Sequence, residues 1–243
     1  MSLSPLQLRH LKVMDIDVYV PRHGAPTTGV VNTVTAPAVR VLEPAAPPAA
    51  PGLPATTEAA WQELRSAVPA CTRCGLHKER TQTVFGVGNP RAQWMIIGEA
   101  PGAEEDRQGE PFVGRAGQLL NAMLAAIGLK REDVFIANIL KCRPPQNRDP
   151  KPEEAASCAP FLQKQIELVQ PRIILALGRI AAQNLLHTAT PIGRMRGQRY
   201  EYPHPKVPVV VTYHPAYLLR SPTEKRKVWE DLQMAMGILG GQS

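Results

Sequence analysis

The segment 172–188, RIILALGRIAAQNLLHT, places a short apolar run directly before an amphipathic one. The run RIILALG has the near-continuous apolar character of a strand that helices cover on both faces. The following residues, RIAAQNLLHT, carry apolar side chains at helical spacing. A strand that leads into a helix is the unit from which parallel sheets are built. The segment therefore predicts one strand–helix unit of an α/β fold.

The same alternation of strands and helices continues from about residue 57 to the end of the chain. Strands are expected at residues 94–100, 133–140, 172–178 and 207–214, and helices at 57–68, 114–128, 151–169, 179–188 and 224–239. Strands that alternate with helices form a parallel sheet with right-handed crossover connections. The fold class predicted for residues 57–243 is therefore α/β, a three-layer α/β/α sandwich with a four-stranded parallel sheet.

The first 56 residues differ in composition from the rest of the chain. Residues 21–56 contain eight prolines among many alanines, threonines and valines. Such a segment cannot bury enough apolar surface to fold, so we expect a disordered linker. Residues 1–20 keep apolar side chains at helical and then strand spacing. This short element is expected to dock on the folded domain of its own chain, to be disordered, or to bind another protein as a peptide.

No part of the sequence has the features of a membrane or secreted protein. No run approaches the roughly 18 apolar residues that a membrane helix needs. Asp15 and Asp17 interrupt the apolar stretch at the N-terminus, which argues against a signal peptide. We therefore expect a cytoplasmic protein without membrane contact. The formal net charge of +7 at pH 7 suits a polyanionic partner but does not by itself identify one.

Polar or conformationally special residues follow all four predicted strands. They are the run Gly98–Gly102 (GEAPG), Asn138, the pair Gly178 and Arg179, and His214. In open α/β sheets, ligands bind outside the carboxyl ends of the strands. Because parallel strands end at the same edge, these residues are expected to form one site.

Four cysteines form a C-x2-C pair, Cys71 and Cys74, and a wider pair, Cys142 and Cys158, with fifteen residues between them. In a cytoplasmic chain they should not form disulfides, which leaves a metal site, a redox dithiol or inert thiols. A zinc ribbon usually has a second C-x2-C knuckle, which is missing here. Four thiolates at irregular spacing suit an iron–sulfur cluster. Such a cluster would tie the loop between Cys142 and Cys158 to the first helix of the domain.

Four motifs, taken with the cysteine spacing, carry a resemblance to a known family. They are GEAPGAEED (98–106), GEPFVGRAGQLL (109–120), ANILKCRPPQNRDP (137–150) and HPAYLLR (214–220). From about residue 70 onward the chain closely resembles the family 4 uracil-DNA glycosylases. The resemblance implies a four-stranded parallel sheet in an α/β/α sandwich and a structural [4Fe–4S] cluster on the four cysteines. It also implies that the chain flips uracil out of DNA and hydrolyses its N-glycosidic bond, leaving an abasic site.

The resemblance also implies roles for the residues that contact the flipped base. Phe112 matches the aromatic residue that stacks on uracil, and Asn138 the amide that reads its edge. His214 matches the histidine that donates a hydrogen bond to O2 of the leaving base. The backbone around these residues is expected to complete the uracil-binding loop at Gly98, Ala100 and Gly102.

The residue that activates water is left open by the sequence. Ala100 stands where the best-known glycosylases carry an aspartate that acts as the general base. Glu99 is the nearest carboxylate, although it is equally suited to bracing the loop. Asn147 matches a family residue proposed to hold the water, and an amide can position water without taking its proton. Glu99 and Asn147 are therefore alternative candidates.

The HPAYLLR motif also predicts how DNA is held open. An apolar side chain that enters the base stack can fill the space of the flipped nucleotide. Leu218 and Leu219 are candidates for this wedge. One of the two is expected to pack into the core, and Leu219 is slightly favoured as the wedge. Basic side chains are expected to contact phosphates. They are Arg220, Arg143 and Arg148, with a looser second patch of Arg194, Arg196 and Arg199.

Two other functions are consistent with the same scaffold. A related branch bonds covalently to uracil-containing DNA through a histidine on an inserted KRRIH-like loop. The corresponding region here, CRPPQNRDP, has neither the insertion nor the histidine, so turnover is favoured over trapping. A protein that binds uracil in DNA but has lost turnover is the other alternative. Residues 6–22 resemble the opening segment of the clamp-loader psi subunit, which implies recruitment by a replication protein. We expect the chain to be a monomer.

Overall fold

Four parallel strands form the centre of the sheet. The structure, a computed structural model, describes residue 12 and residues 55–241, so the predictions for residues 1–20 and 21–56 lie almost entirely outside it. The four strands are β2 (Trp94–Gly98), β3 (Phe135–Asn138), β4 (Ile173–Leu177) and β6 (Lys206–Thr212), and neighbours pair in parallel. Every residue of β2, β3 and β4 is buried, which accounts for their apolar sequences. The predicted four-stranded parallel arrangement is confirmed.

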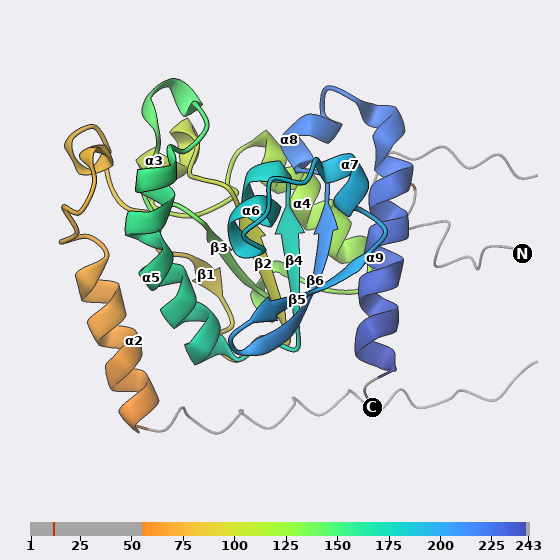
Figure 1. Cartoon of the computed structure of the whole chain (residues 1–243), viewed down its shortest axis with the longest axis horizontal. Helices are drawn as coiled ribbons and strands as arrows, with labels where there is room; N and C mark the ends of the chain where they lie inside the picture. The colour runs from red at the N-terminus through yellow and green to blue at the C-terminus, as the bar shows by residue number, and fades with distance from the viewer. Residues whose placement is uncertain (1–11, 13–54, 242–243) are drawn as a thin grey trace, which may run out of the picture.

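Two antiparallel edge strands, which the sequence analysis did not predict, extend this sheet to six strands. The strand order is β1-β3-β2-β4-β6-β5 (Figure 1). The edge strand β1 (Val87–Gly88) pairs with β3, and β5 (Arg199–Pro203) forms a hairpin with β6. Strand β5 alternates exposed and half-buried residues and has no fully buried face. The sheet is therefore mixed, with the predicted parallel strands between two antiparallel edges.

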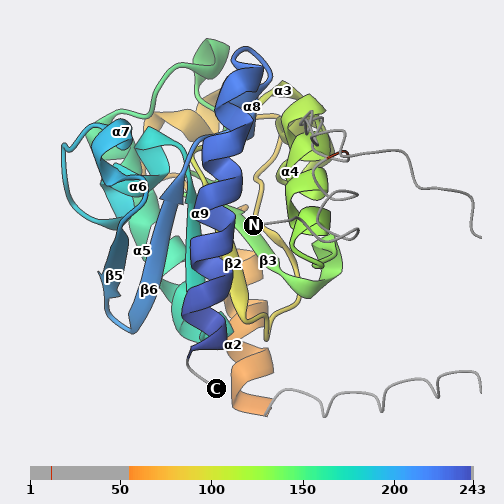
Figure 2. The same ribbon diagram turned by 90° about the vertical axis from the view of Figure 1, so that its right-hand side faces the viewer.

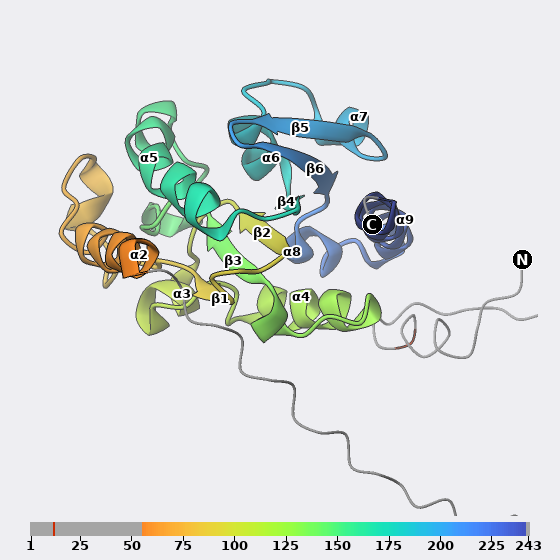
Figure 3. The same cartoon turned by 90° about the horizontal axis from the view of Figure 1, so that it is seen from below.

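Helices cover both faces of the sheet and complete three layers (Figure 3). Along β2, Met95 and Ile97 enter one core, whereas Trp94 and Ile96 enter the other, because successive strand residues point to opposite faces. The first core is closed by α2 (Ala55–Ala67), α5 (Pro152–Val169) and α6 (Arg179–Leu185), and the second by α4 (Arg115–Ala126), α8 (Pro215–Leu218) and α9 (Lys225–Gly240). The predicted α/β/α sandwich is confirmed. None of the helices in the described residues has the length and apolar character needed to cross a membrane.

The segments that follow the parallel strands collect at one edge of the sheet, the upper edge in Figure 1. Two short α-helices lie near this edge, α3 (Ala103–Gln108) after β2 and α7 (Ile192–Met195) before β5. The 3-10 helices are η1 (Gly75–Lys78), η2 (Arg131–Asp133), η3 (Pro145–Asn147) and η4 (Pro222–Glu224). Residues that are distant in sequence therefore come together where the strands end.

A buried ion pair fixes α9 against β6 and α7. The Asp231 carboxylate, 1% exposed, accepts hydrogen bonds from Thr212 Oγ1 at 2.6 Å and Arg196 Nε at 2.8 Å. The Arg196 guanidinium also lies over the Tyr213 ring, 4.5 Å from its centroid. Figure 2 shows α9 crossing the sheet at β6. The prediction that Arg196 contacts DNA is wrong, because its side chain is only 10% exposed and is paired with Asp231.

Replacing Arg196 with alanine is expected to lower the free energy of unfolding by about 3–5 kcal/mol, because the buried Asp231 carboxylate loses its charged partner. Arg194 lies in α7, which Arg196 follows directly, but is exposed, so Arg194→Ala is the matched control. Its effect should stay within about 0.5 kcal/mol. Urea denaturation followed by circular dichroism measures both values. Equal stabilities of the two variants would show that the ion pair does not hold α9 in place.

Candidate active site

A cleft of about 460 Å³ opens at the carboxyl ends of the parallel strands. It brings together nine of the residues that the sequence predicted for the site: Glu99, Ala100, Gly102, Phe112, Asn138, Asn147, Arg148, His214 and Arg220. Pro101, from the predicted run Gly98–Gly102, also lines it, as do residues that the sequence did not single out, including Glu105, Ala116, Asp149 and Tyr217. The ends of β2, β3 and β6 therefore meet at one site, whereas Gly178 and Arg179, predicted for the same site at the end of β4, do not line the cleft.

Phe112 enters the cleft with a strained backbone. Its φ angle of 54° is in the left-handed region, which bulky residues rarely adopt. Two glycines make room for it. A Cβ atom at Gly117 would lie 1.8 Å from the Phe112 carbonyl oxygen, and one at Gly98 would lie 2.6 Å from the Phe112 ring. Arg131 donates to the same carbonyl at 3.4 Å. The ring is thus fixed at the wall of the cleft.

Asn138, the last residue of β3, carries a buried amide oxygen without a partner. The residue is 2% exposed, and its Oδ1 accepts no hydrogen bond from the described part of the chain. A Cβ atom at Gly98 would lie 2.5 Å from this oxygen, so only glycine leaves the space in front of it open. An unpaired buried acceptor costs about 1–3 kcal/mol. The amide is therefore prepared to receive an N–H group from a ligand in the cleft.

His214 is held as a neutral hydrogen-bond donor. Its Nδ1 accepts from the Ala216 N–H at 3.1 Å, so the ring proton lies on Nε2. Burial lowers the pKa of His214 to about 4, and the positive charge of Arg220 acts in the same direction. The imidazole ring lies 5.6 Å from the Phe112 ring, centroid to centroid. At neutral pH the residue can donate to a ligand atom without carrying charge itself.

Glu105 joins the two loops that form the mouth of the cleft, and the sequence analysis did not identify it. Its carboxylate accepts from the backbone N–H groups of Gly102 at 3.1 Å, Val113 at 3.0 Å and Gly114 at 3.2 Å. The contact to Gly102 is a capping interaction at the start of α3. A carboxylate three residues after a helix cap is a signal that sequence alone can provide. The bonds to Val113 and Gly114 depend on the fold.

Comparison with known proteins adds an independent finding. The family described as the Uracil DNA glycosylase superfamily matches residues 85–233. The chain belongs to this superfamily. It is 48% identical to a type-4 uracil-DNA glycosylase of Archaeoglobus fulgidus, with 71% of this chain and 90% of the relative covered. The type-4 enzymes of Pyrobaculum aerophilum and Thermotoga maritima are 44% and 43% identical, over 72% and 76% of this chain and 93% and 97% of theirs. The resemblance found in the motifs is confirmed.

The two candidates for water activation in this superfamily member have different surroundings. Burial, together with the nearby Asp149 carboxylate, raises the pKa of Glu99 to about 7 against the opposing effect of Arg179. Arg179 pairs with Asp149 at 2.5 Å. Asn147 is exposed, and its Oδ1 already accepts from Arg143 Nε at 2.8 Å. Glu99 therefore has the properties of a proton acceptor, whereas the Asn147 amide oxygen is engaged.

The leucines of the HPAYLLR motif have opposite environments. Leu218 is 0% exposed and packs in the core beneath α8, whereas Leu219 is 38% exposed. The prediction that Leu218 contacts DNA is wrong, because one helical turn directs the two neighbouring side chains to different sides. Arg220 is exposed and lines the cleft. Arg148, also predicted to contact DNA, lines the cleft and binds both carboxylate oxygens of Glu154, at 2.8 and 2.6 Å. Its guanidinium fixes the loop before α5.

The four cysteines surround one enclosed cavity. Cys71, Cys74, Cys142 and Cys158 all line it, and all are free thiols. Cys142 and Cys158 are buried. Burial raises the pKa of the Cys142 thiol, and Arg80 Nη1, which donates to Cys142 Sγ at 3.1 Å, opposes this shift. The structure therefore brings both cysteine pairs to a common site, although the two pairs are far apart in sequence.

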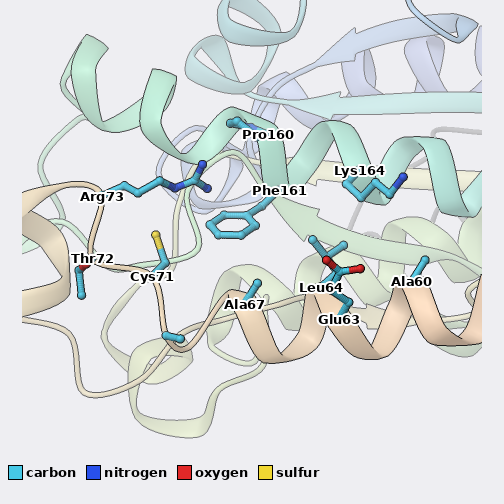
Figure 4. Close-up of a pocket in the computed structure, with 11 residues that line it drawn as sticks. Ala60, Glu63, Leu64, Ala67, Cys71, Thr72, Arg73, Pro160, Phe161 and Lys164 are labelled. Carbon is cyan, nitrogen blue, oxygen red and sulfur yellow. The ribbon is translucent and has the colours of Figure 1, made fainter.

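A larger groove of about 600 Å³ lies beside the cysteine cavity, between α2 and α5. Figure 4 shows Cys71 at one end of this groove, near Arg73 and Phe161. The Arg73 guanidinium covers the Phe161 ring, 4.3 Å from its centroid. The residues that line this larger groove include none of the predicted site residues at the strand ends. We therefore place the candidate active site in the smaller cleft, of about 460 Å³.

Replacing Glu99 with glutamine is expected to raise the melting temperature, and more at pH 8 than at pH 4.5. The folded-state pKa of Glu99 is raised from 4.5 to about 7. Between these values the unfolded chain releases the proton while the folded protein keeps it, so stability falls as pH rises. Above pH 7 the folded protein carries the full cost of the charge, partly screened by solvent. The gain at pH 8 should be about 2–5 °C.

Calorimetry at both pH values measures this difference, with Glu132→Gln, at an exposed glutamate, as the control. A gain that is the same at pH 4.5 and pH 8 would show that Glu99 has an ordinary carboxyl pKa.

Proposed function

We propose that this chain is a monofunctional uracil-DNA glycosylase, which flips uracil out of DNA and hydrolyses its N-glycosidic bond to leave an abasic site. The single observation that carries the proposal is the orphaned Oδ1 of Asn138, buried between Gly98 and Phe112. A buried acceptor of this kind needs an N–H donor from a ligand. The membership of the chain in the superfamily, and its similarity to type-4 uracil-DNA glycosylases, support the same function.

Uracil presents to Asn138 the groups that its amide requires. N3–H of uracil can donate to the orphaned Oδ1, and O4 can accept from the amide Nδ2. Cytosine has an acceptor at N3 and a donor at N4, so both contacts would be mismatched. Each mismatched buried group costs about 1–3 kcal/mol, which is enough to reject cytosine strongly. Phe112 supplies a rigid face on which the flipped base can stack.

His214 is suited to stabilise the leaving base. Cleavage leaves the bonding electron pair on uracil, and negative charge develops at O2 while the sugar becomes positive. The Nε2–H of neutral His214 can donate to O2, and Gly178 allows the close packing of the residue, since a Cβ there would lie 3.0 Å from His214 Cβ. A preorganised donor of this kind contributes about 3–4 kcal/mol to the transition state. The neutral state of the imidazole makes it a donor and not a proton source.

Water then adds to the sugar and releases a proton. We assign the acceptance of this proton to Glu99, because its raised pKa and its place in the cleft match a general base near neutral pH. Asn147 would orient the water through its amide while Arg143 holds its oxygen. The positively charged sugar needs only a weak nucleophile, so a carboxylate with a pKa of about 7 is sufficient.

The DNA-facing surface follows from the exposed residues at the cleft. We propose Leu219 as the wedge that fills the space of the flipped nucleotide, with Arg220 contacting a phosphate beside it. Tyr217 lies in the same wall, 36% exposed, and its ring packs against Tyr213 at 4.9 Å. A stacked aromatic pair at this position can support a neighbouring base.

The four cysteines fit a [4Fe–4S] cluster. In the described residues, no three His, Cys, Asp or Glu side chains are arranged to hold a single metal ion. Four thiols around one cavity suit a polynuclear cluster better. Cys71, Cys74, Cys142 and Cys158 would hold it, and it would supply a structural cross-link between the loop after β3 and the loop after α2. The Arg80 side chain and the Lys141 backbone N–H, which donate to Cys142 and Cys158, would stabilise the ligating sulfurs.

The central test is release of uracil from a labelled oligonucleotide under multiple turnover. We expect turnover by the wild-type chain and a fall in kcat of about 10²–10³-fold in His214→Ala, with DNA binding retained. His187→Asn changes an exposed histidine outside the cleft and serves as the control. A single turnover that leaves a covalent DNA adduct would identify a trapping protein, and binding without any release would identify a protein that has lost the reaction.

The cluster is tested by metal and sulfide analysis of protein purified without oxygen. We expect about four iron and four sulfide per chain and a broad absorption band that gives a brown colour. Cys142→Ala should lose the colour and most of the soluble yield, because the loop that follows Asn138 is no longer cross-linked. Stoichiometric zinc without iron would overturn the assignment, and a colourless Cys142→Ala variant with full activity would overturn the structural role.

A further inference from the structure

Lys141 is a buried cation that the reaction described above does not use. The residue is 1% exposed and lies three positions after Asn138, between the uracil cleft and the cysteine cavity. Its Nζ donates to the Asn138 carbonyl oxygen at 2.8 Å and to Gln165 Oε1 at 2.6 Å. A buried charge is costly to keep, so its contacts need an explanation beyond packing.

The two bonds of Lys141 link Asn138 to the rigid part of the fold. Gln165 lies in α5 and is 0% exposed, and its Nε2 donates to the Phe85 carbonyl at 2.8 Å. The Lys141 backbone N–H donates to Cys158 Sγ at 3.2 Å, also on α5. Lys141 is thus fixed to α5 at its backbone and at the end of its side chain. Its ammonium group then holds the carbonyl of Asn138.

The bond from Lys141 affects the position of the Asn138 side chain, whose amide oxygen has no hydrogen-bond partner. A side chain with an unpaired buried oxygen gains by rotating toward any available donor. The backbone after β3 still bonds the chain after β2, from the Ile139 N–H to the Gly98 carbonyl at 2.9 Å and from the Leu140 N–H to the Glu99 carbonyl at 3.0 Å. Lys141 adds a bond to the carbonyl of Asn138 itself. A bond that fixes the Asn138 carbonyl fixes the backbone from which the amide projects. Displacement of a substrate-positioning group by about 1 Å can cost about 10²-fold in rate.

We propose that Lys141 is a positioning residue for base recognition: it fixes the main chain of Asn138 so that the amide remains aimed into the cleft. The inference rests on the proposed function, since it assumes that Asn138 reads the base. The inference predicts that loss of Lys141 weakens the binding of DNA that carries uracil and leaves the binding of DNA that lacks a base unchanged.

The test compares two non-reacting oligonucleotides that bind the same surface. One carries 2′-fluoro-deoxyuridine, which resists cleavage, and the other carries a tetrahydrofuran abasic site. In Lys141→Met we expect the Kd for the fluorinated uracil strand to rise about 10-fold or more, and kcat/KM for uracil release to fall about 10²-fold. The Kd for the abasic strand should change by less than about twofold, because no base is present to be read. Lys164→Met, an exposed lysine on α5, is the matched control.

Two further variants keep the test decisive. If Lys141→Met does not fold, as judged by its melting curve and iron content, Gln165→Met keeps the lysine and removes its anchor, together with the bond to the Phe85 carbonyl. We expect a rise of about 3–10-fold in Kd for the uracil strand alone, smaller than the effect of displacing the group directly. Unchanged affinity for both strands in the folded variant would overturn the inference, and so would an equal loss for both.

Asn138→Ala separates the inference from the proposed function. If this variant binds the uracil strand as the wild type does, Asn138 does not read the base and the proposed function loses its main support. If Asn138→Ala loses that binding while Lys141→Met keeps it, the reading stands and the positioning role of Lys141 is wrong.

Discussion

The cleft depends on how closely backbone and rings approach one another at the carboxyl ends of the parallel strands. Gly98, Gly117 and Gly178 lie at the three points of closest approach. At each, a Cβ atom would meet Phe112, Asn138 or His214 at 3.0 Å or less, and at Gly117 it would meet backbone that cannot turn aside. The shape of the site therefore depends on glycine at these three positions, because any larger residue would collide with the groups that line the cleft. The sheet supplies the rigid frame that brings the strand ends together.

Burial of the groups around the cleft accounts for three unusual properties. The amide oxygen of Asn138 is left without a partner, the pKa of His214 falls to about 4, and the pKa of Glu99 rises to about 7. Burial disfavours the charged form of both titratable groups, so the histidine loses its proton and the carboxyl keeps its own. The proposed function, in which the site binds a neutral base and Glu99 takes up a proton near neutral pH, gains from both shifts.

Periodicity predicts the parts of this chain that depend on local sequence. The four central strands were recognisable because burial on both faces requires continuous apolar runs, whereas β5 has only exposed and half-buried residues and β1 has two residues. The site was predicted where residues directly follow strands. Residues whose contacts come from distant parts of the chain were not predicted. Glu105 accepts a hydrogen bond from the Val113 N–H, and Lys141 donates one to Gln165, and neither contact can be read from local sequence. Leu218 and Leu219 show the remaining limit, since the rotation of a single helical turn decides which of two equivalent side chains is buried.

The short helix α8 has a consequence for the order of events on DNA. His214 is the N-cap of α8, because its side chain accepts the hydrogen bond from the Ala216 N–H, and Leu219 is the C-cap. The four residues of α8 form a single turn between them. A single turn is not stable alone, so its stiffness comes from Leu218, which is buried beneath it. The group assigned to the leaving base and the side chain assigned to the base stack are therefore two ends of one rigid body. With His214 and Leu219 in their proposed roles, opening the duplex and capturing the nucleotide would be a single mechanical step.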